Sequence, residues 1–460
     1  MTAATKRLYW PGLAISLILI KALLCLADPT LRFFLGDSES YLYSALTGWI
    51  PPDRSFVYGI LVRLSAVYTG SLYGLLVVQS MCGVLTSLIC ARLALELGAS
   101  RSIGVLLAIL VCLEPAQLFY ERMVMAESPG TLCLLVMFTC GFLYLKHGRW
   151  GWLPLMSLAG ITTVALRMSL LPVVLGFALL PPLLLLFQRG RAHFLQAGMH
   201  VCIAILCTAG FHKGYMQLYG TVAHSDPDYL GTSGLFRLGL VSPLVKAEHL
   251  TRLGLSADLL QSVRQPLGDH RAREAQIWMD DGLIQVLKRA TGEDADRYAR
   301  KIAARALQDD IPGFLGLAWA TTADYFVDTQ TAPRMQDDLG TRALPDEMAQ
   351  SLRTQLGYEA SSVHAQRNLM SRYFETSANW LIFCLFGLAP LAVATLVRLW
   401  HIRRTAALLL AFTAIGMVTG QLLFSHIVSF RYLHPFAPLL WMTLAVLITP
   451  RRDAPIDPQA

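Results

Sequence analysis

Residues 128–145 read SPGTLCLLVMFTCGFLYL, a run of 18 residues without a charged side chain. This length falls within the roughly 17–25 apolar residues that a helix needs to cross a bilayer. Glu127 precedes the run directly, and Lys146 and Arg149 follow it. Because cytoplasmic loops are enriched in Lys and Arg, we expect the end at Lys146 to face the cytoplasm. The stretch therefore predicts both a membrane span and its direction.

Similar apolar runs recur along the chain. We predict spans at 10–28, 72–97, 103–119, 128–145, 151–166, 170–187, 196–212, 379–397, 405–424 and 434–449. The composition agrees, because only 15% of the residues are charged and the mean hydropathy is +0.49, whereas soluble domains carry about 25% charge. Lys21 interrupts the first run, and Leu24 stands where a lipoprotein cleavage site would have a small residue. We therefore expect an uncleaved first span in an all-α polytopic membrane protein.

Basic residues orient these spans. If the N-terminus is cytoplasmic, every cytoplasmic connection and both termini carry positive charge. The residues are Lys6, Arg7, Arg101, Lys146, Arg149, Arg189, Arg191, Arg398, Arg403, Arg404, Arg451 and Arg452. The predicted extracytoplasmic segments are 29–71, 120–127, 167–169, 213–378 and 425–433. This topology places the chain in a bacterial-type inner membrane, with both termini in the cytoplasm.

The longest outer segment divides the chain into three parts. Of 31 acidic residues, 21 lie between Gly214 and Ala378, so we predict a water-facing loop domain at 213–378. It separates a membrane core at 1–212, which includes the first outer loop 29–71, from C-terminal spans and a tail at 379–460. Helical patterns at 257–263 and 278–287 predict a mostly helical loop. The polar stretch 328–353 is expected to be weakly ordered and flexible.

Several function classes are excluded by composition and motifs. The net charge of +7 comes from short loops rather than from a basic patch with aromatics, so no nucleic-acid partner is expected. All nine cysteines lie in apolar runs, which predicts neither disulfides nor a thiolate metal site. The pairs Asp226/Asp228 and Asp294/Asp296 match a DxD motif but fall on the outer side, where nucleotide sugars are not expected. No cofactor is predicted; a divalent metal is left open.

The first outer loop begins with FFLGDSESY at residues 33–41. Asp37 or Ser38 can cap a helix that runs through Tyr41, as short polar residues do at helix N-termini. Asp37 also follows an aromatic run directly, which places its carboxylate near the bilayer surface. The sequence therefore supports two interpretations of Asp37, as a helix cap and as a catalytic acid or base.

Four arginines fall on the predicted outer side, against the charge bias. Arg54 and Arg122 lie in the first and second outer segments, Arg167 lies between two apolar runs, and Arg431 lies in the last outer turn. Lipid phosphates or a substrate phosphate would each account for such residues, because the planar guanidinium binds phosphate through two N–H groups. We predict that these arginines converge with Asp37 and Glu127 on one cavity. Its predicted lining also includes Glu39, Tyr41, Tyr58, Glu121, His426 and Tyr432.

The order and sidedness of these motifs resemble the GT-C superfamily of membrane glycosyltransferases, in particular family 39 and the aminoarabinose-transferase-like branch. The matching segments are 36–41, 51–58, 120–129, 166–167 and 430–435, within residues 1–220 and 380–450. The resemblance implies a GT-C-like bundle of about ten transmembrane helices with amphipathic juxtamembrane helices. It also implies transfer of a sugar from a polyprenyl-phosphate donor to an extracytoplasmic glycolipid, glycan or protein.

Roles for individual residues follow from the same resemblance. Asp37 would be the general base of an inverting transfer, and Glu127 would orient the acceptor or assist Asp37. The arginines would hold the leaving phosphate. Arg54 departs from the family pattern, since relatives often show Lys or His at that place.

Two other functions remain open at this point. A secondary transporter or flippase of a lipid-linked substrate would use a similar set of spans, although transporters tend to show repeats and charges near the midplane. A ligase or polymerase that uses a diphosphate-linked oligosaccharide would share the lipid donor.

Overall fold

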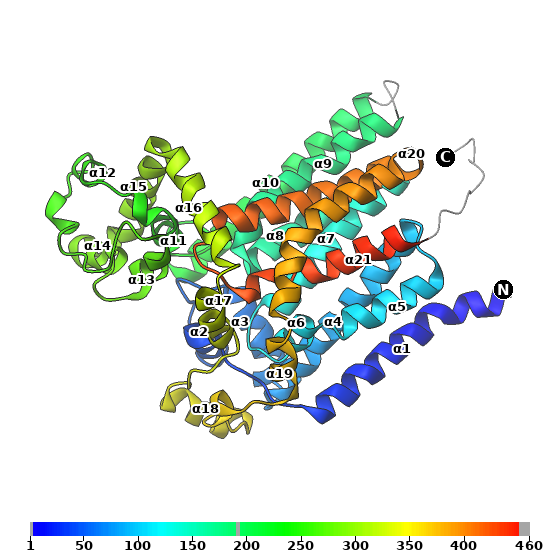
Figure 1. Ribbon diagram of the computed structural model, residues 1–460, viewed down its shortest axis with the longest axis horizontal. Helices are drawn as coiled ribbons and strands as arrows, with labels where there is room; N and C mark the ends of the chain where they lie inside the picture. The colour runs from blue at the N-terminus through cyan, green and yellow to red at the C-terminus, as the bar shows by residue number, and fades with distance from the viewer. Residues whose placement is uncertain (1–2, 190–193, 450–460) are drawn as a thin grey trace.

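The computed structural model describes residues 3–189 and 194–449, and every named element in these ranges is a helix (Figure 1). An isolated β-bridge joins Arg32 to Met123. The predicted all-α fold is therefore confirmed. Three of the basic residues used to orient the chain, Arg191, Arg451 and Arg452, lie outside the described residues.

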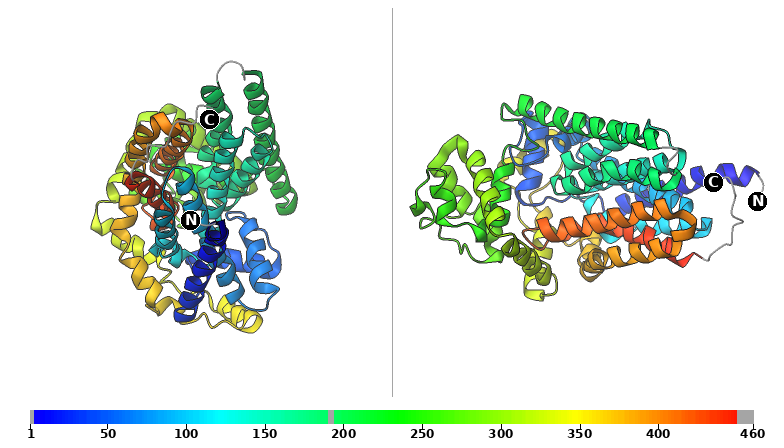
Figure 2. Two further views of the ribbon diagram at one scale, coloured as in Figure 1. Left: turned by 90° about the vertical axis from the view of Figure 1, so that its right-hand side faces the viewer. Right: turned by 90° about the horizontal axis from the view of Figure 1, so that it is seen from above.

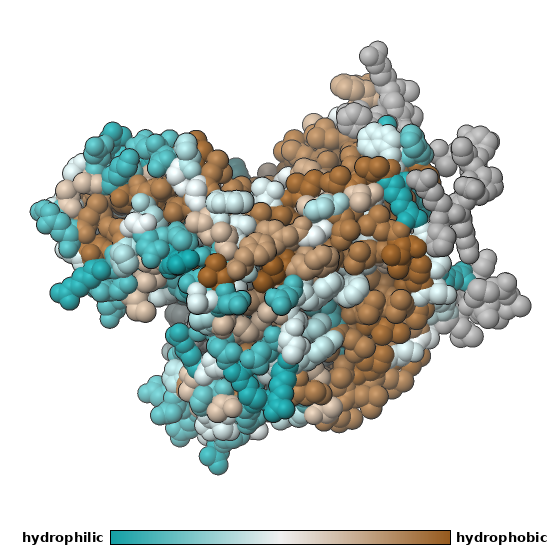
Figure 3. Space-filling view, viewed as in Figure 1, coloured by the Kyte–Doolittle hydropathy of each residue, from teal (hydrophilic) through white to brown (hydrophobic). Residues whose placement is uncertain are grey.

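Long apolar helices lie side by side and form the body of the molecule (Figures 1 and 2). Among the described residues, seven helices are long and apolar enough to cross a membrane. The surface over this bundle is largely hydrophobic in Figure 3, as lipid contact requires. The bundle comprises α1 (Ala3–Ala27), α4 (Tyr73–Glu96), α5 (Arg101–Cys112), α7 (Glu127–His147), α8 (Trp152–Leu166), α9 (Leu171–Arg189), α10 (Phe194–Ala223), α20 (Ala378–Phe424) and α21 (Phe436–Ile448).

The predicted span 103–119 is wrong as a continuous helix. Helix α5 ends at Cys112, and a short helix, α6 (Pro115–Tyr120), begins after Glu114. The Glu114 carboxylate accepts a hydrogen bond from the Gln117 backbone N–H at 2.6 Å, and proline occupies the first helical position of α6. An acidic cap followed by proline is a typical helix start. It interrupts the span within an otherwise apolar run.

The spans predicted at 379–397 and 405–424 are the two halves of α20. Its backbone is non-helical at Arg403, with φ −144° and ψ 48°. The two halves run in opposite directions on either side of this residue (Figure 1). The prediction of two spans joined by a charged turn is therefore confirmed, with the break at Arg403. Helix α10 also continues past its predicted end at residue 212, to Ala223.

The first loop forms two helical pieces beside the bundle, α2 (Leu35–Thr47) and α3 (Phe56–Val62), which runs into a π-helical turn, η1 (Arg63–Val67). Helix α2 begins before Asp37, and its cap residue Phe34 makes no side-chain cap bond. Instead the Phe34 backbone N–H donates to the Ser38 hydroxyl at 2.8 Å. The prediction that Asp37 is a helix cap is therefore wrong, which leaves its carboxylate for other partners.

The first part of the long loop packs around a core of its own at one end of the bundle (Figure 2). Leu238, Ile284 and Ile302 are buried in this core. Its elements are α11 (Ser233–Val241), η4 (Ser242–Leu244), α12 (Ala247–Thr251), η5 (Ala257–Leu259), η6 (His270–Ala272), α13 (Arg273–Trp278), α14 (Leu283–Thr291), η7 (Gly292–Asp294), α15 (Ala295–Asp309) and α16 (Ile311–Asp324). The mostly helical prediction is confirmed. The helices expected at 257–263 and 278–287 are shorter, because the first forms only η5 and a break separates α13 from α14.

The second part of the loop packs directly on the bundle. It contains α17 (Asp328–Asp338), α18 (Asp346–Leu356), η8 (Val363–Ala365) and α19 (Leu369–Glu375). The expectation of a weakly ordered stretch at 328–353 is wrong. Met335 and Leu339 enter the main core of the bundle, and Leu352 and Leu356 pack in a second core beside the first loop. Tertiary burial of a few apolar side chains thus orders a segment whose composition is polar.

Candidate active site at one end of the helix bundle

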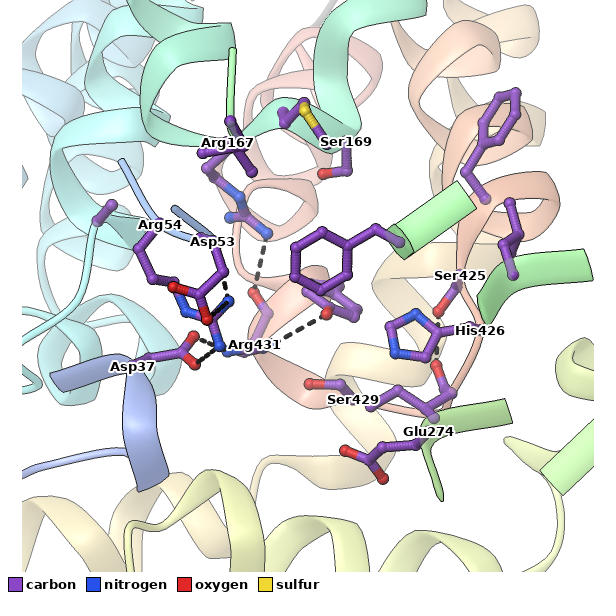
Figure 4. A pocket seen from close by; sticks show the side chains of 18 of the residues that line it. Asp37, Asp53, Arg54, Arg167, Ser169, Glu274, Ser425, His426, Ser429 and Arg431 are labelled. Carbon is purple, nitrogen blue, oxygen red and sulfur yellow. Dashed lines mark hydrogen bonds and ion pairs between the residues drawn. The ribbon is translucent and has the colours of Figure 1, made fainter. Parts of the chain in front are cut away.

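A cavity of about 1220 Å³ lies where the first loop, the ends of α7, α8 and α20, and the long loop meet. Its polar wall surrounds Asp37 (Figure 4). Another wall is apolar and includes Leu171 and Val173 of α9 and Met417 and Phe424 of α20. Such a cavity suits a ligand that has both a charged group and an apolar portion.

Asp37, in the first turn of α2, lies at the centre of the polar wall. Its Oδ2 accepts a hydrogen bond from Arg431 Nη1 at 2.8 Å, and its Oδ1 is paired with Arg54 Nη2 (Figure 4). Only 7% of Asp37 is exposed. Burial raises the pKa of this carboxyl, but the charges and hydrogen bonds of the two guanidiniums outweigh burial and lower the pKa below its ordinary value. Asp37 is therefore ionised at neutral pH.

Arg431 reaches Asp37 from the opposite end of the chain, in the 3₁₀ turn η9 (Phe430–Leu433). Its guanidinium lies 4.4 Å from the ring centroid of Phe34 and 4.8 Å from that of Tyr432. Nη2 also donates to the Tyr432 hydroxyl at 2.9 Å. Because a guanidinium stacked on rings still presents its N–H edge, Arg431 can hold a planar anion while its position stays fixed.

Arg54 approaches Asp37 from the connection between α2 and α3. Its Nη1 donates to the Asp53 carbonyl at 2.8 Å, and its guanidinium lies 5.4 Å from the ring centroid of Trp278 in the long loop. The loop domain therefore packs directly on the polar wall. The position of Arg54 beside Asp37 agrees with the predicted convergence.

Arg167 and Glu127 complete the polar wall. Arg167 follows α8 directly, and its Nη2 donates to the Arg431 carbonyl at 3.4 Å. A Cβ atom on Gly130 would lie 3.1 Å from Arg167 Cδ, so glycine at 130 makes room for this side chain. Glu127 begins α7 and is 6% exposed. Asp37, Arg54, Glu127, Arg167 and Arg431 thus all line the cavity, as predicted.

Several polar atoms in this wall are buried without a hydrogen-bond partner among the described residues. They are Arg54 Nε, Arg167 Nη1, Arg431 Nε and Glu127 Oε2. An unsatisfied buried polar group costs about 1–3 kcal/mol. An anion in the cavity would accept hydrogen bonds from the unsatisfied N–H donors of the three guanidiniums. The wall is therefore built to receive an anionic ligand.

Four other predicted lining residues, Glu39, Tyr41, His426 and Tyr432, do lie at the cavity. Burial, with the charges of Arg273 and Arg431, lowers the pKa of His426 to about 3. Burial also raises the pKa of Tyr41 above its ordinary value. Both side chains are consequently neutral at physiological pH and add hydrogen-bonding groups without adding charge.

The prediction that Arg122 lines the cavity is wrong. Its guanidinium donates to the carbonyls of Leu24 at 3.0 Å, Asp28 at 2.9 Å and Leu118 at 2.9 Å. Arg122 thus binds carbonyl groups at and just beyond the end of α1. Its role is to join α1 to the turn after α6.

Glu121 and Tyr58 also lie away from the cavity, which corrects their predicted positions. Glu121 Oε1 pairs with Lys21 Nζ at 2.8 Å, and both side chains are almost completely buried. The Tyr58 hydroxyl donates to Gln79 Oε1 at 2.9 Å. Glu121 thus packs between α1 and the short helix α6, and Tyr58 packs against Gln79 of α4 and Tyr41 of α2.

Replacing Lys21 with methionine is expected to destabilise the protein strongly. The change would leave the Glu121 carboxylate buried without its cation, and breaking a buried pair in this way costs about 3–5 kcal/mol. Thermal unfolding of the purified protein in detergent, followed by tryptophan fluorescence, measures the effect. The double variant K21M/E121Q should recover most of the lost Tm. If K21M had the same Tm as the unsubstituted protein, the Lys21–Glu121 pair would not stabilise the fold.

Asp338, at the end of α17, is an important residue that the sequence did not reveal. Its carboxylate accepts hydrogen bonds from the Ser429 hydroxyl at 3.1 Å and from the backbone N–H groups of Phe430 at 2.5 Å and Arg431 at 3.3 Å. It is 2% exposed, and burial raises its pKa to about 6. Asp338 therefore fixes the backbone from which Arg431 projects. Its partners lie about ninety residues away in sequence, so no local pattern could have found it.

The long loop also supplies a charged pair to the cavity, which the sequence did not predict. Glu274 and Arg334 both line it and are paired with each other.

The two DxD pairs form structural contacts, in agreement with the prediction that they are not a metal site for nucleotide sugars. Asp296 Oδ1 accepts from the Gly234 N–H at 2.7 Å, and Asp228 pairs with Arg300 at 3.0 Å.

No group of three or more His, Cys, Asp or Glu side chains suited to a metal ion occurs in residues 3–189 and 194–449.

Comparison with known proteins gives few matches. No family model matches the sequence, and neither does any curated protein. The chain is similar to the crystal structure of ArnT from Cupriavidus metallidurans in the apo state, at 14% identity and a TM-score of 0.36, covering 95% of this chain and 78% of that chain. It is also similar to the crystal structure of ArnT bound to undecaprenyl phosphate, at 14% identity and a TM-score of 0.30, covering 96% and 78% of the two chains.

Proposed function

We propose that the cavity is the active site of a membrane glycosyltransferase, which transfers a monosaccharide from a polyprenyl-phosphate donor to an extracytoplasmic acceptor. The observation that carries the proposal is the polar wall around the ionised carboxylate of Asp37. There Arg54, Arg167 and Arg431 each have an N–H group without a partner among residues 3–189 and 194–449. This wall adjoins an apolar surface from α9 and α20. A phosphate with a polyprenyl tail matches both surfaces.

The donor phosphate would bind at the arginines. In such a transfer the acceptor hydroxyl oxygen attacks the anomeric carbon, the bond from that carbon to the phosphate oxygen breaks, and polyprenyl phosphate leaves. Negative charge grows on the phosphate as the bond breaks, so guanidiniums at this place stabilise the transition state more than the ground state. The attack inverts the anomeric carbon, because the nucleophile and leaving group lie on opposite faces.

Asp37 is proposed to accept the proton of the acceptor hydroxyl. Its two oxygens are engaged by Arg54 and Arg431, which lower its basicity. A donor phosphate competes for the same N–H groups, and its binding would free an Asp37 oxygen and raise the pKa of the carboxyl. Donor binding and activation of the acceptor would in this way be coupled, which limits proton removal to the complex that can react.

Glu127 is proposed to orient the acceptor hydroxyl. Its Oε2 has no hydrogen-bond partner in the part of the chain that the structure describes, although it lies in the same wall as Asp37. An unpaired carboxylate oxygen is a free acceptor for a sugar hydroxyl. This geometry also makes Glu127 the second candidate for the base.

The proposal is tested by reconstituting the purified protein with a polyprenyl-phosphate-linked sugar and candidate envelope acceptors. Mass spectrometry should show an acceptor heavier by one sugar residue, together with released polyprenyl phosphate. If the donor lipid moves between leaflets with its sugar still attached and no acceptor gains mass, the protein is a flippase.

Asp338 predicts the acid limb of the pH profile. Above its pKa of about 6, the ionised Asp338 carboxylate accepts the backbone hydrogen bonds that hold Arg431 in place. Below that pH the carboxyl is protonated, and these hydrogen bonds are weakened. The value of kcat/KM, which reports the enzyme without donor, should therefore fall as the pH drops through about 6. Asp37, with its lowered pKa in that state, titrates further into the acid range. Asp338→Asn should be less active at pH 7.5 and should lose this limb. Asp346 is exposed, so Asp346→Asn should keep the acid limb. An acid limb that persists in Asp338→Asn would show that Asp338 does not cause it.

A further inference from the structure

Helix α16 presents an exposed face without a charged residue. Ile311, Leu315 and Trp319 follow at intervals of four and so share one face of the helix. Their exposed fractions are 56%, 52% and 74%, and Phe326, just beyond the helix, is 68% exposed. The neighbouring helix α15 differs, since it exposes Arg297 to water. The face of α16 is therefore apolar where a water-facing loop helix would carry charge.

The opposite face of α16 packs on the protein. Phe314 lines the cavity, and its ring centroid lies 6.4 Å from that of Phe424 at the end of α20. Ala318 and Thr321 are buried on the same side. Helix α16 thus forms part of the cavity wall, with its apolar face turned outward.

The exposed face of α16 is continuous with the surface of the membrane-spanning bundle. The Phe326 ring lies 5.0 Å from that of Phe386, which is eight residues into α20 and therefore about 12 Å along the helix from Ala378. Phe383 of α20 is itself 50% exposed. Figure 1 shows α16 crossing the end of the second half of α20 rather than extending away from it.

We propose that α16 lies in the interfacial layer of the bilayer, with Ile311, Leu315, Trp319 and Phe326 among the lipid chains. It would then form the wall that separates the cavity from the membrane. The helix has 14 residues and is about 21 Å long, too short to cross a bilayer core of about 30 Å. An uncharged helix face of this size with an exposed tryptophan is typical of the interface.

Lipid is the occupant that the surroundings favour. The face joins side chains of α20 that a membrane span turns toward lipid, and it offers no charged group to a protein partner. The proposal concerns membrane placement and stands independently of the reaction. It corrects the expectation that all of 213–378 is water-facing.

The test uses the intrinsic fluorescence of the full chain reconstituted in bilayers. Subtracting the emission of Trp319→Phe from that of the unsubstituted protein isolates the signal of Trp319. We expect this signal to lose most of its intensity in bilayers of brominated phosphatidylcholine and to resist quenching by aqueous iodide. Arg297→Trp on α15 is the matched control, because its added emission should be quenched by iodide and not by brominated lipid.

Two outcomes would overturn the proposal. Quenching of Trp319 by iodide alone would place α16 in water. Protection of Trp319 from both quenchers would show that a protein, such as a second copy of the chain, covers this face.

Discussion

Asp37→Asn is expected to abolish sugar transfer while the protein still folds. The amide cannot take the acceptor proton, and loss of a general base lowers rates by about 10²–10⁴-fold. The amide has the shape of the carboxylate, so the fold is kept. Arg54 and Arg431 lose the negative charge that faces them, but they keep their stacking partners Trp278, Phe34 and Tyr432. Single-turnover transfer from a polyprenyl-phosphate sugar measures the loss, and a monodisperse elution profile with a cooperative melt checks folding.

The control for this experiment is Asp328→Asn, an exposed acid at the start of α17 that should leave the rate unchanged. Full activity of Asp37→Asn would remove Asp37 from the reaction. If Glu127→Gln were inactive in that case, the base would be Glu127 and Asp37 would serve only to hold the two arginines.

Arg431→Ala is expected to weaken use of the donor more than any other arginine change. The side chain pairs with Asp37, stacks on two rings and points a free Nε into the wall. Truncating one partner of a buried charged pair costs about 2–5 kcal/mol, or roughly a 30-fold or greater loss of kcat/KM. Arg431→Lys should recover only part of the loss, because an ammonium lacks the planar fork.

Transfer rates at varied donor concentration, together with native mass spectrometry of bound polyprenyl phosphate, separate donor affinity from turnover for Arg431→Ala. Arg353→Ala, whose side chain is 76% exposed, is the matched control. An unchanged apparent affinity for polyprenyl phosphate would show that Arg431 does not contact the donor.

The spans and the convergence of most charged residues could be predicted because both depend on local patterns. Apolar length marks a span, and a basic residue on the wrong side of the membrane stands out against the charge bias. Arg167 and Arg431 were found in this way, and both line the cavity. The prediction of a helix boundary failed where one residue decides it, as at Glu114.

Residues of the second turn show why sidedness alone is insufficient. Glu121, Arg122 and Glu127 share one short segment, yet only Glu127 reaches the cavity. Which way each side chain faces depends on how α1 packs against the turn, and that packing is not encoded in the spacing. Asp338 escaped prediction for a related reason, since its hydrogen bonds join α17 to a turn far along the chain.

The central claim is that this cavity transfers a sugar from a lipid phosphate. Mass spectrometry of envelope lipids and glycans, from cells that contain the unsubstituted chain and from cells that contain only Asp37→Asn, tests it most directly. We expect one envelope acceptor to lose a monosaccharide in the variant while the polyprenyl-phosphate sugar accumulates. Identical lipids and glycans in the two cell lines, with equal amounts of folded protein, would contradict it.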